Sequence, residues 1–367
     1  MKMIDSCTRP LGVAALCAAL AACSGLNARN VAHNTPAQTA SKSVPAGGEF
    51  ADLARWPQVG QFIERMAQHD GFEPLELQRL FGQVQRLDAV IQLIKPAPPS
   101  RPKDWRAYRA RFVEPVRINA GVRFWNQYSD KLAQAEAQYG VPAEIIVAIL
   151  GVETIYGRNT GNFRVMDSVA TLAFDYPDTP NRNARMDYFR GELENTLLYA
   201  RQSHIDPFSL LGSYAGAIGL PQFMPGSILR YAVDFDSDNV IDLRNSPADA
   251  IGSIANFLVQ HGWKAGEPIV FPASVANDGR RDWESFIGQG LRAGYRPEQL
   301  KAGGVIPAVE PLPEMPYGLV DLQNGEEPTE YWLGADNFFA ITQYNRSYFY
   351  AMSVVDLSRA IRAARNH

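Results

Sequence analysis

Apolar residues recur at helical spacing through the first half of the chain. Five of them near the predicted start of the fold follow one another at intervals of one or three residues: Trp56, Val59, Phe62, Ile63 and Met66. The same spacing predicts helices over residues 75–91, 105–112 and 122–139. The proline-rich residues 96–102 interrupt the series. We therefore expect this half to be almost entirely helical.

The second half begins with a different pattern. Residues 145–152 are apolar without a polar break, which predicts a buried helix with Glu153 at its end. Apolar stripes predict further helices over 246–262, 337–344 and 348–365. Between them, residues 264–332 are rich in Pro and Gly with short apolar pieces, which predicts a small β-containing insertion.

The first 48 residues are predicted to lie outside the fold. Residues 11–22 form an apolar run of the length found in signal peptides and too short for a membrane helix. Small residues followed by Cys23 resemble the lipobox of bacterial lipoproteins, in which the signal is removed and the Cys is lipidated. Ser24 after it resembles the outer-membrane sorting pattern of Gram-negative lipoproteins. Residues 23–48 then predict a lipidated Cys and a flexible tether.

Composition narrows the classes of function. The 367 residues are 46% hydrophobic and 20% charged, which excludes wholesale disorder and predicts about two domains. The net charge of −4 gives no basic surface for nucleic acid. All three Cys lie within the first 23 residues, so a processed chain would hold no disulfide, Cys metal site or thiol nucleophile.

Glu153 is the strongest single candidate for chemistry. Burial at the end of an apolar helix would raise the pKa of its carboxyl, because burial disfavours the charged form. A carboxylic acid that stays protonated near neutral pH can serve as a general acid. From the residues alone, a Glu that reaches solvent or pairs with an Arg remains the other interpretation.

Several motifs, in order along the chain, resemble the membrane-bound lytic murein transglycosylase B family. They are Gly151-Val152-Glu153-Thr154 with Tyr156-Gly157, the stretch 170–177 (ATLAFDYP), the stretch 213–225 (SYAGAIGLPQFMP), Asp249–Ser253 with His261-Gly262-Trp263, and Tyr344-Asn345-Arg346-Ser347 with Tyr350-Ala351-Met352. The resemblance covers about residues 50–365. No single motif would suffice, but together they are specific.

The resemblance implies a mainly α (α+β) fold. A lysozyme-like helical core would be joined by a helical N-terminal domain and a small β-containing insertion. The implied boundaries along the chain are 1–22 for the signal peptide, 23–48 for the tether, 49–140 for the N-terminal domain, 141–263 for the core, 264–332 for the insertion and 333–367 for the helices that complete the core.

The resemblance also implies an activity on peptidoglycan glycan strands. Such enzymes cleave the MurNAc-β-1,4-GlcNAc bond without water and leave 1,6-anhydro-MurNAc ends. Glu153 matches the single catalytic Glu, which acts as acid and then as base. No cofactor is implied for catalysis. The implied location is the periplasmic face of the outer membrane, reached through the lipid on Cys23.

The resemblance also implies which residues around the predicted catalytic Glu bind the substrate, because they stand at the family's substrate-binding positions. The matching substrate-binding residues are Ser213, Gln222, Phe223, Met224, Tyr344, Asn345, Tyr350, Tyr188, Tyr108 and Arg185. Core packing is the other interpretation for each single Tyr among 15. Phe257 stands where the family has a groove Tyr, so a hydroxyl contact is predicted to be missing there.

An acidic stretch, 234–242, predicts a cation site. Its spacing resembles an EF-hand loop, whose alternating carboxylates and one backbone carbonyl bind calcium. The expected ligands of a structural Ca²⁺ are Asp234, Asp236, Asp238, Val240 through its carbonyl, and Asp249. Two features depart from the pattern: Asn239 replaces the usual Gly, and the last carboxylate comes one residue later than expected. A solvated acidic loop is the alternative.

Two other functions remain open at this stage. A hydrolytic muramidase would need a second carboxylate about 5–9 Å from Glu153, and Asp167, Asp175 and Glu194 are candidates. A non-catalytic peptidoglycan-binding lipoprotein would have no use for a buried Glu. Proteins of cell-wall synthesis or division are candidate partners that the sequence does not identify.

Overall fold

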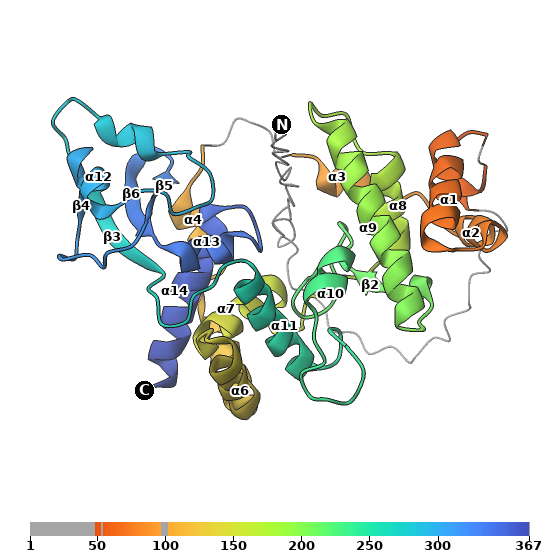
Figure 1. Ribbon diagram of the computed structural model, residues 1–367, viewed down its shortest axis with the longest axis horizontal. Coiled ribbons are helices and arrows are strands. Elements are labelled where there is room, and N and C mark those ends of the chain that lie inside the picture. Colours follow the sequence, from red (N-terminus) through yellow and green to blue (C-terminus); the bar gives the residue numbers. More distant parts are fainter. Residues whose placement is uncertain (1–47, 53, 97–101, 367) are drawn as a thin grey trace, which may run out of the picture.

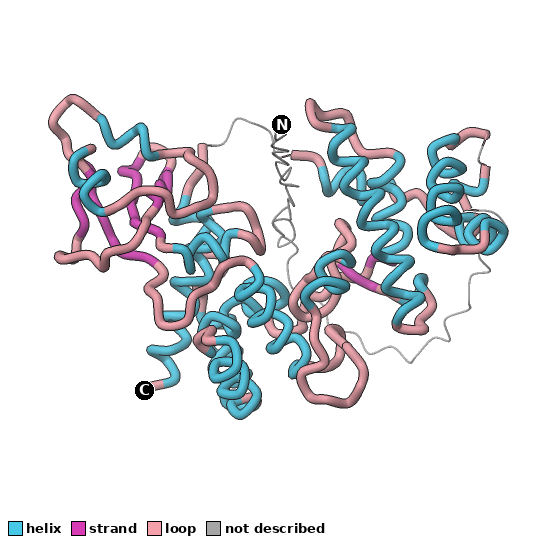
Figure 2. The backbone as a smooth tube through the Cα atoms, in the orientation of Figure 1, coloured by secondary structure: helices cyan, strands magenta, loops and turns pink. Residues whose placement is uncertain are grey.

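The computed structural model describes residues 48–52, 54–96 and 102–366. Figure 1 shows a strand-rich part and the first two helices at opposite ends of the long axis, with most of the helices between them. Figure 2 shows that helices dominate the described chain and that strands gather in one region. The mainly α prediction is confirmed. The predicted signal peptide and the lipidation site Cys23 lie outside the described residues.

The N-terminal region is built from short helices. They are η1 (Glu49–Ala51), α1 (Pro57–Asp70), α2 (Pro74–Phe81), α3 (Asp88–Ile94) and α4 (Trp105–Arg109). The single helix expected over 75–91 is wrong, because the chain leaves helical geometry between Gly82 and Leu87. There the backbone N–H groups of Gln85 and Leu87 donate to side chains of a distant helix instead. Tertiary hydrogen bonds thus override the local periodicity.

A second expected helix is also divided. Residues 122–139 fall in α5 (Pro115–Gln127) and α6 (Ser129–Tyr139), with Tyr128 between them at φ −115° and ψ 28°. After Gly140 in the left-handed conformation, Pro142 precedes α7 (Ala143–Thr154). All of α7 except Glu144 and Glu153 is buried, as the apolar run predicted. Helices α5, α6, α11 (Pro247–Gln260) and α14 (Tyr348–Arg365) pack around it.

Residues 155–211 show no apolar pattern strong enough to predict their elements. In the structure they form β1 (Phe163–Arg164), α8 (Val165–Phe174), α9 (Arg182–Gln202), η2 (Pro207–Ser209) and, with residue 212, β2 (Leu211–Gly212). Strands β1 and β2 pair antiparallel. The loop after β2 leads to α10 (Pro225–Tyr231), and an acidic loop then leads to α11 (Pro247–Gln260). Helix α10 packs against α9.

The predicted β-containing insertion is present as an antiparallel sheet. Its strands and the neighbouring helices are β3 (Val270–Val275), η3 (Asp282–Phe286), α12 (Pro297–Ala302), β4 (Val305–Pro307), β5 (Gly318–Asn324) and β6 (Glu327–Gly334). The strand order is β4-β3-β6-β5. One face covers a small core that includes Trp283, Leu300 and Tyr317. On the other face, β5 packs against α4 and α14 and so joins the sheet to the helical core.

The chain ends in α13 (Asp336–Thr342) and α14 (Tyr348–Arg365), close to the predicted bounds. Helix α14 packs against α5, α7 and α13. No single helix in the described ranges is both long and apolar enough to cross a membrane. The bent pair α6 and α7, at 115° to each other, passes the same test together by length and composition alone.

Candidate active site

Glu153 lies in the last turn of α7, where the buried helix reaches partly exposed surroundings. Directly after the helix, Ile155 and Tyr156 both take the left-handed conformation, at φ 51° and 58°. This conformation is unfavourable for a β-branched residue and is found where the surrounding structure demands it. It turns the chain sharply away, so that Glu153 stands at the end of the helix.

The carboxyl of Glu153 accepts one short hydrogen bond. The Tyr350 hydroxyl, from the first turn of α14, donates to Glu153 Oε1 over 2.6 Å. Burial raises the pKa of Glu153 to about 7, against the opposing effect of the hydrogen bond from Tyr350. A carboxyl with this pKa can donate a proton and take one back near neutral pH. The direction of this pKa shift is the one expected for a carboxyl at the end of an apolar helix.

Two more tyrosines, Tyr108 and Tyr344, lie in the surroundings of the Glu153–Tyr350 pair. Burial, together with the negative charge of Glu153, raises the pKa of Tyr108 on α4 to about 12, so Tyr108 stays neutral. The ring of Tyr344 stacks on that of Tyr350, with centroids 6.2 Å apart and planes 13° apart. The Tyr344 hydroxyl donates to the carbonyl of Pro221 over 2.6 Å. Residues from α4, α7, α14 and the 213–224 loop therefore meet here.

The 213–224 loop is held by its own side chains. Gln222 takes the left-handed conformation at φ 51°, and its amide donates to the carbonyls of Gly219 and Thr160. The hydroxyl of Ser213 accepts from the N–H of Ala217 over 3.1 Å. The Phe223 ring lies 5.7 Å from that of Tyr344, and Met224 is buried beside it in sequence. Four predicted site residues are thus fixed in one rigid loop.

The other predicted site residues come from other elements. Arg185 and Tyr188 are on α9, where Arg185 is buried and its guanidinium lies against Tyr176. Asn345 is partly exposed beside Tyr344. Phe257, which stands where the family has a Tyr, packs its ring against those of Phe223 and Tyr344, with centroids 5.5 and 4.8 Å away. Phe257 thus brings an apolar ring to an aromatic cluster beside the loop.

Three residues of the site were not singled out as candidates from the sequence. The Arg117 guanidinium from α5 donates to the Gly151 carbonyl, two residues before Glu153. Glu192 on α9 is buried and accepts from the N–H of Gly226, at the start of α10. Thr154 bonds across to the 213–224 loop. No spacing rule identifies the first two, because their partners lie 34 residues away in the sequence.

Two cavities in the described structure lie away from Glu153. One of about 430 Å³ is on the sheet, between β3 and β6, and is lined by Pro272 and Trp332 among others. The other, of about 380 Å³, is lined by Arg86, Asp175 and Arg182 among others. Neither of these two cavities marks the candidate site, which rests instead on Glu153 and its partners.

The candidates for a second carboxylate are engaged elsewhere. Asp167 accepts from Arg164 over 2.6 Å, and Asp175 accepts from Arg86 over 2.6 Å. Glu194 accepts from Arg65 over 3.2 Å. Each carboxylate is thus held by an arginine, which opposes the role of a free nucleophile or base.

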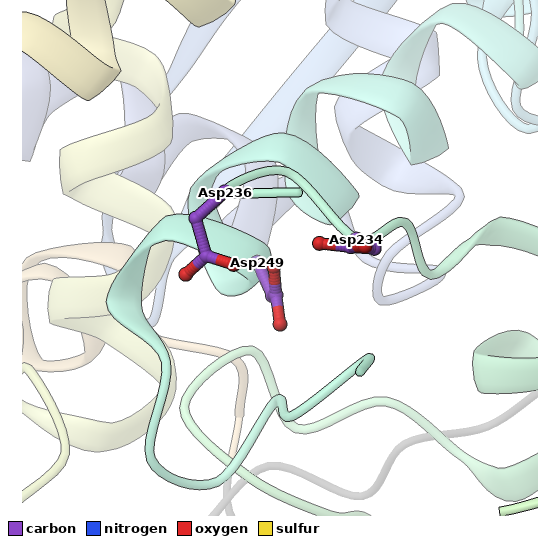
Figure 3. A group of neighbouring side chains, drawn as sticks. All are labelled: Asp234, Asp236 and Asp249. Atoms are coloured by element: carbon purple, nitrogen blue, oxygen red, sulfur yellow. The ribbon is translucent and has the colours of Figure 1, made fainter. Parts of the chain in front are cut away.

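The acidic loop before α11 brings carboxylates together. Figure 3 shows Asp234, Asp236 and Asp249 around a common space, with carboxylate oxygens within 4.8 Å of one another. Asp249 is buried and accepts from the N–H groups of Phe235 and Asp242. Such a hard oxygen cluster fits Ca²⁺, since unneutralised carboxylates would repel.

Asp238, one of the predicted ligands, does not join the other three carboxylates, and the carbonyl predicted at Val240 stays a prediction. The side chain of Asp238 accepts from the N–H of Val240 over 2.8 Å and is not part of the three-carboxylate group. Val240 itself is exposed. Asn239 takes φ 71°, the left-handed conformation that the usual Gly would provide.

Comparison with known proteins gives consistent matches. The family model described as "Transglycosylase SLT domain" matches residues 54–359. Membrane-bound lytic murein transglycosylase B of Escherichia coli (strain K12) is 42% identical over 327 residues, which are 87% of this chain and 86% of that protein.

Solved structures agree. The soluble lytic transglycosylase SltB1 from Pseudomonas aeruginosa is 45% identical with a TM-score of 0.76, over 85% of this chain and 100% of that one. The Escherichia coli lytic transglycosylase Slt35 in complex with calcium is 41% identical with a TM-score of 0.75, over 88% and 97% of the two chains.

Proposed function

This chain belongs to the transglycosylase SLT domain family of lytic murein transglycosylases, and we propose that it cleaves the MurNAc-β-1,4-GlcNAc bond without water. The enzyme class, a lyase that cleaves peptidoglycan, follows from the family, as does its lysozyme-like helical fold. The finer proposal concerns the product, a 1,6-anhydro-MurNAc end, and the residue that forms it. The observation that carries it is the Glu153 carboxyl, with its pKa raised to about 7 and its hydrogen bond from Tyr350.

One carboxyl suffices for both proton transfers in this reaction. Protonated Glu153 gives its proton to the glycosidic oxygen as the bond from that oxygen to C1 of MurNAc breaks. The carboxylate then takes the proton of the C6 hydroxyl of the same sugar as its oxygen bonds to C1. Glu153 ends in its starting protonation state, and no water is consumed. Glycosidases usually need two carboxylates, but the internal hydroxyl replaces the second one here.

The residues around Glu153 are proposed to hold the sugars. Tyr108, which is partly buried, is proposed to offer a ring face and a hydroxyl to a sugar, while the buried Tyr344 and Tyr350 would support the wall behind it. The 213–224 loop adds Ser213, Gln222, Phe223 and Met224, while Asn345, Tyr188 and Arg185 are proposed to contact more distant parts of the strand. The rigid internal hydrogen bonds of the loop support a preformed binding surface.

Mass spectrometry of the products tests the proposed reaction. We expect the full-length chain, purified in detergent, to release muropeptides from purified sacculi that are one water lighter than hydrolytic products. The reason is that C6–OH, and not water, attacks C1. A muramidase digest of the same sacculi supplies the hydrated reference masses. Ordinary reducing ends as the main product would replace the proposal with a hydrolase.

The membrane anchor is a second proposal, supported by the lipobox-like sequence and by the membrane-bound relative in Escherichia coli. We propose a lipid on Cys23 that holds the enzyme at the periplasmic face of the outer membrane. Replacing this residue (Cys23→Ser) is expected to move the protein from the membrane pellet to the soluble fraction, because the acylated thiol is lost. Immunoblots of both fractions measure this. Cys17→Ser, within the apolar run, is the matched control and should stay in the pellet. Equal pelleting of both variants would exclude Cys23 as the anchor.

We also propose a structural Ca²⁺ in the acidic loop. Asp234, Asp236 and Asp249 would hold it, and its charge would neutralise their mutual repulsion. The solved relative in complex with calcium supports this. The site joins the loop to the start of α11, so it would order this segment without taking part in bond cleavage.

A further inference from the structure

A closed circuit of contacts passes through Glu153. Its carboxyl accepts from Tyr350, whose ring stacks on Tyr344. The Tyr344 hydroxyl donates to the carbonyl of Pro221. The preceding carbonyl, of Leu220, accepts from the hydroxyl of Thr154, which is the residue next to Glu153. The circuit therefore fixes the catalytic helix, α14 and the 213–224 loop relative to one another.

Thr154 is the link that returns the circuit to α7. Its side chain is fully buried, and its hydroxyl donates to Leu220 over 2.9 Å. The same oxygen accepts from the N–H of Gly157 over 3.0 Å. The hydroxyl thus holds both the loop and the sharp left-handed turn that follows the helix. A buried hydroxyl with both its donor and acceptor functions used in this way is well determined in position.

The hydrogen bond between Thr154 and Leu220 lies where it can affect the distance between Glu153 and the 213–224 loop. Leu220 lies two residues before Gln222, and its own N–H donates to Leu243. Without the hydroxyl, the loop would lose the hydrogen bond from Thr154 on α7. It would keep the hydrogen bond from Leu220 to Leu243 and the one from Tyr344 to Pro221. The carboxyl of Glu153 and the loop could then separate by a fraction of an ångström while both remain folded.

We propose that Thr154 is a positioning residue, whose hydroxyl sets the distance between Glu153 and the substrate-binding loop. This rests on the proposed role of Glu153. Thr154 does not touch the substrate, so its loss should reduce the rate of bond cleavage more than the binding of the glycan. Misplacing a catalytic group by about 1 Å can lower a rate by about 10²-fold.

Two substitutions isolate the hydroxyl. Thr154→Val keeps the shape and removes every hydrogen bond of the hydroxyl, including a longer contact of 3.4 Å to the Leu150 carbonyl within α7. Thr154→Ser keeps the hydroxyl and removes one methyl group. With the full-length chain in detergent and soluble glycan strands, we expect Thr154→Val to lower kcat by about 10-fold to 100-fold with KM within about 2-fold. Thr154→Ser should stay within about 3-fold of the unchanged protein.

Thr171 offers a matched control for the loss of a buried hydroxyl. It is also fully buried, and its hydroxyl donates to the carbonyl of Asp167 over 2.7 Å and accepts from Leu87 over 3.0 Å. It joins α8 to the segment before α3, and neither of these hydrogen-bond partners belongs to the circuit. Thr171→Val should lower the melting temperature while kcat of the folded fraction is unchanged.

The outcomes separate the proposals. A loss of kcat in Thr154→Val that Thr154→Ser restores and Thr171→Val lacks supports the positioning role. A kcat near that of the unchanged protein, or a loss shared equally by Thr171→Val, overturns it. If Thr154→Val does not fold, Thr154→Ala provides the same comparison. Activity that survives in Glu153→Gln would instead overturn the proposed function.

Discussion

Replacing Glu153 by Gln is expected to lower kcat by about 10³-fold or more, with the fold intact. Gln has the same shape but can neither release a proton to the glycosidic oxygen nor take one from the C6 hydroxyl. General acid–base catalysis contributes about 10²–10⁴-fold, and here one group serves in both steps. The Gln side chain can still accept from the Tyr350 hydroxyl, so the local contact is preserved. Release of muropeptides from sacculi over time measures the loss.

Glu144 provides the matched control on the same helix. It lies in the first turn of α7 and pairs with Arg362 on α14 over 2.7 Å. Glu144→Gln should therefore change stability slightly and leave kcat within about 2-fold, since surface pairs contribute about 1 kcal/mol or less. Comparable losses in the two variants would mean that Glu153 acts only through the stability of α7.

The pH dependence adds a second readout for Glu153. The acid form is the active one, so kcat/KM should be high below a pH of about 7 and fall above it. Tyr350 donates to the carboxylate and so favours the charged form. In Tyr350→Phe the pKa of Glu153 should rise and move this alkaline limb to higher pH. A limb that stays in place would show that another group controls the rate.

Calcium is expected to raise the melting temperature by roughly 5 °C. A ligand at about 100 times its dissociation constant stabilises a protein by about 2.7 kcal/mol, and each kcal/mol shifts a chain of this size by about 2 °C. The physical cause is the neutralisation of three carboxylates within 4.8 Å. Calorimetry of the full-length chain with Ca²⁺ and with a chelator measures the shift.

Two variants distinguish a calcium site from a general salt effect. Asp236→Asn removes one ligand from an exposed position, where the side chain accepts a hydrogen bond from the Ser246 hydroxyl over 3.0 Å. It should lose most of the calcium-dependent shift. Asp278→Asn, in the loop after β3, is the control and should keep the full shift. An equal response to Mg²⁺, or no difference between the two variants, would argue against a specific calcium site.

The sequence predicted the elements whose local pattern is strong. The run before Glu153 is apolar on every side, so burial of that helix followed directly from the residues. Helix α9 escaped prediction because its 21 residues mix charged and apolar side chains without one apolar stripe. The breaks at Gly82–Leu87 and Tyr128 were also missed. The first of these depends on hydrogen bonds to α8, which local periodicity does not contain.

In the candidate site, too, some residues could be predicted from local sequence motifs, whereas others depend on tertiary contacts. The EF-hand-like spacing predicts Asp234 and Asp236 as ligands of one cation, and the family resemblance adds Asp249. By contrast, Glu192 and Arg117 follow no motif, and their roles depend on partners in other elements. For Asp238, the spacing suggested a ligand, whereas the fold of the loop turns its carboxylate to Val240.

The sequence by itself determined that a carboxyl would stand at the end of a buried helix, because apolar periodicity encodes burial. It also carried the motifs that identify the family. Only the tertiary structure decided which groups face that carboxyl. Tyr350 is 197 residues away along the chain, and the loop that Thr154 contacts is 66 residues away. Such contacts arise from the packing of α7, α14 and the loop, and packing depends on the whole fold and not on any local pattern.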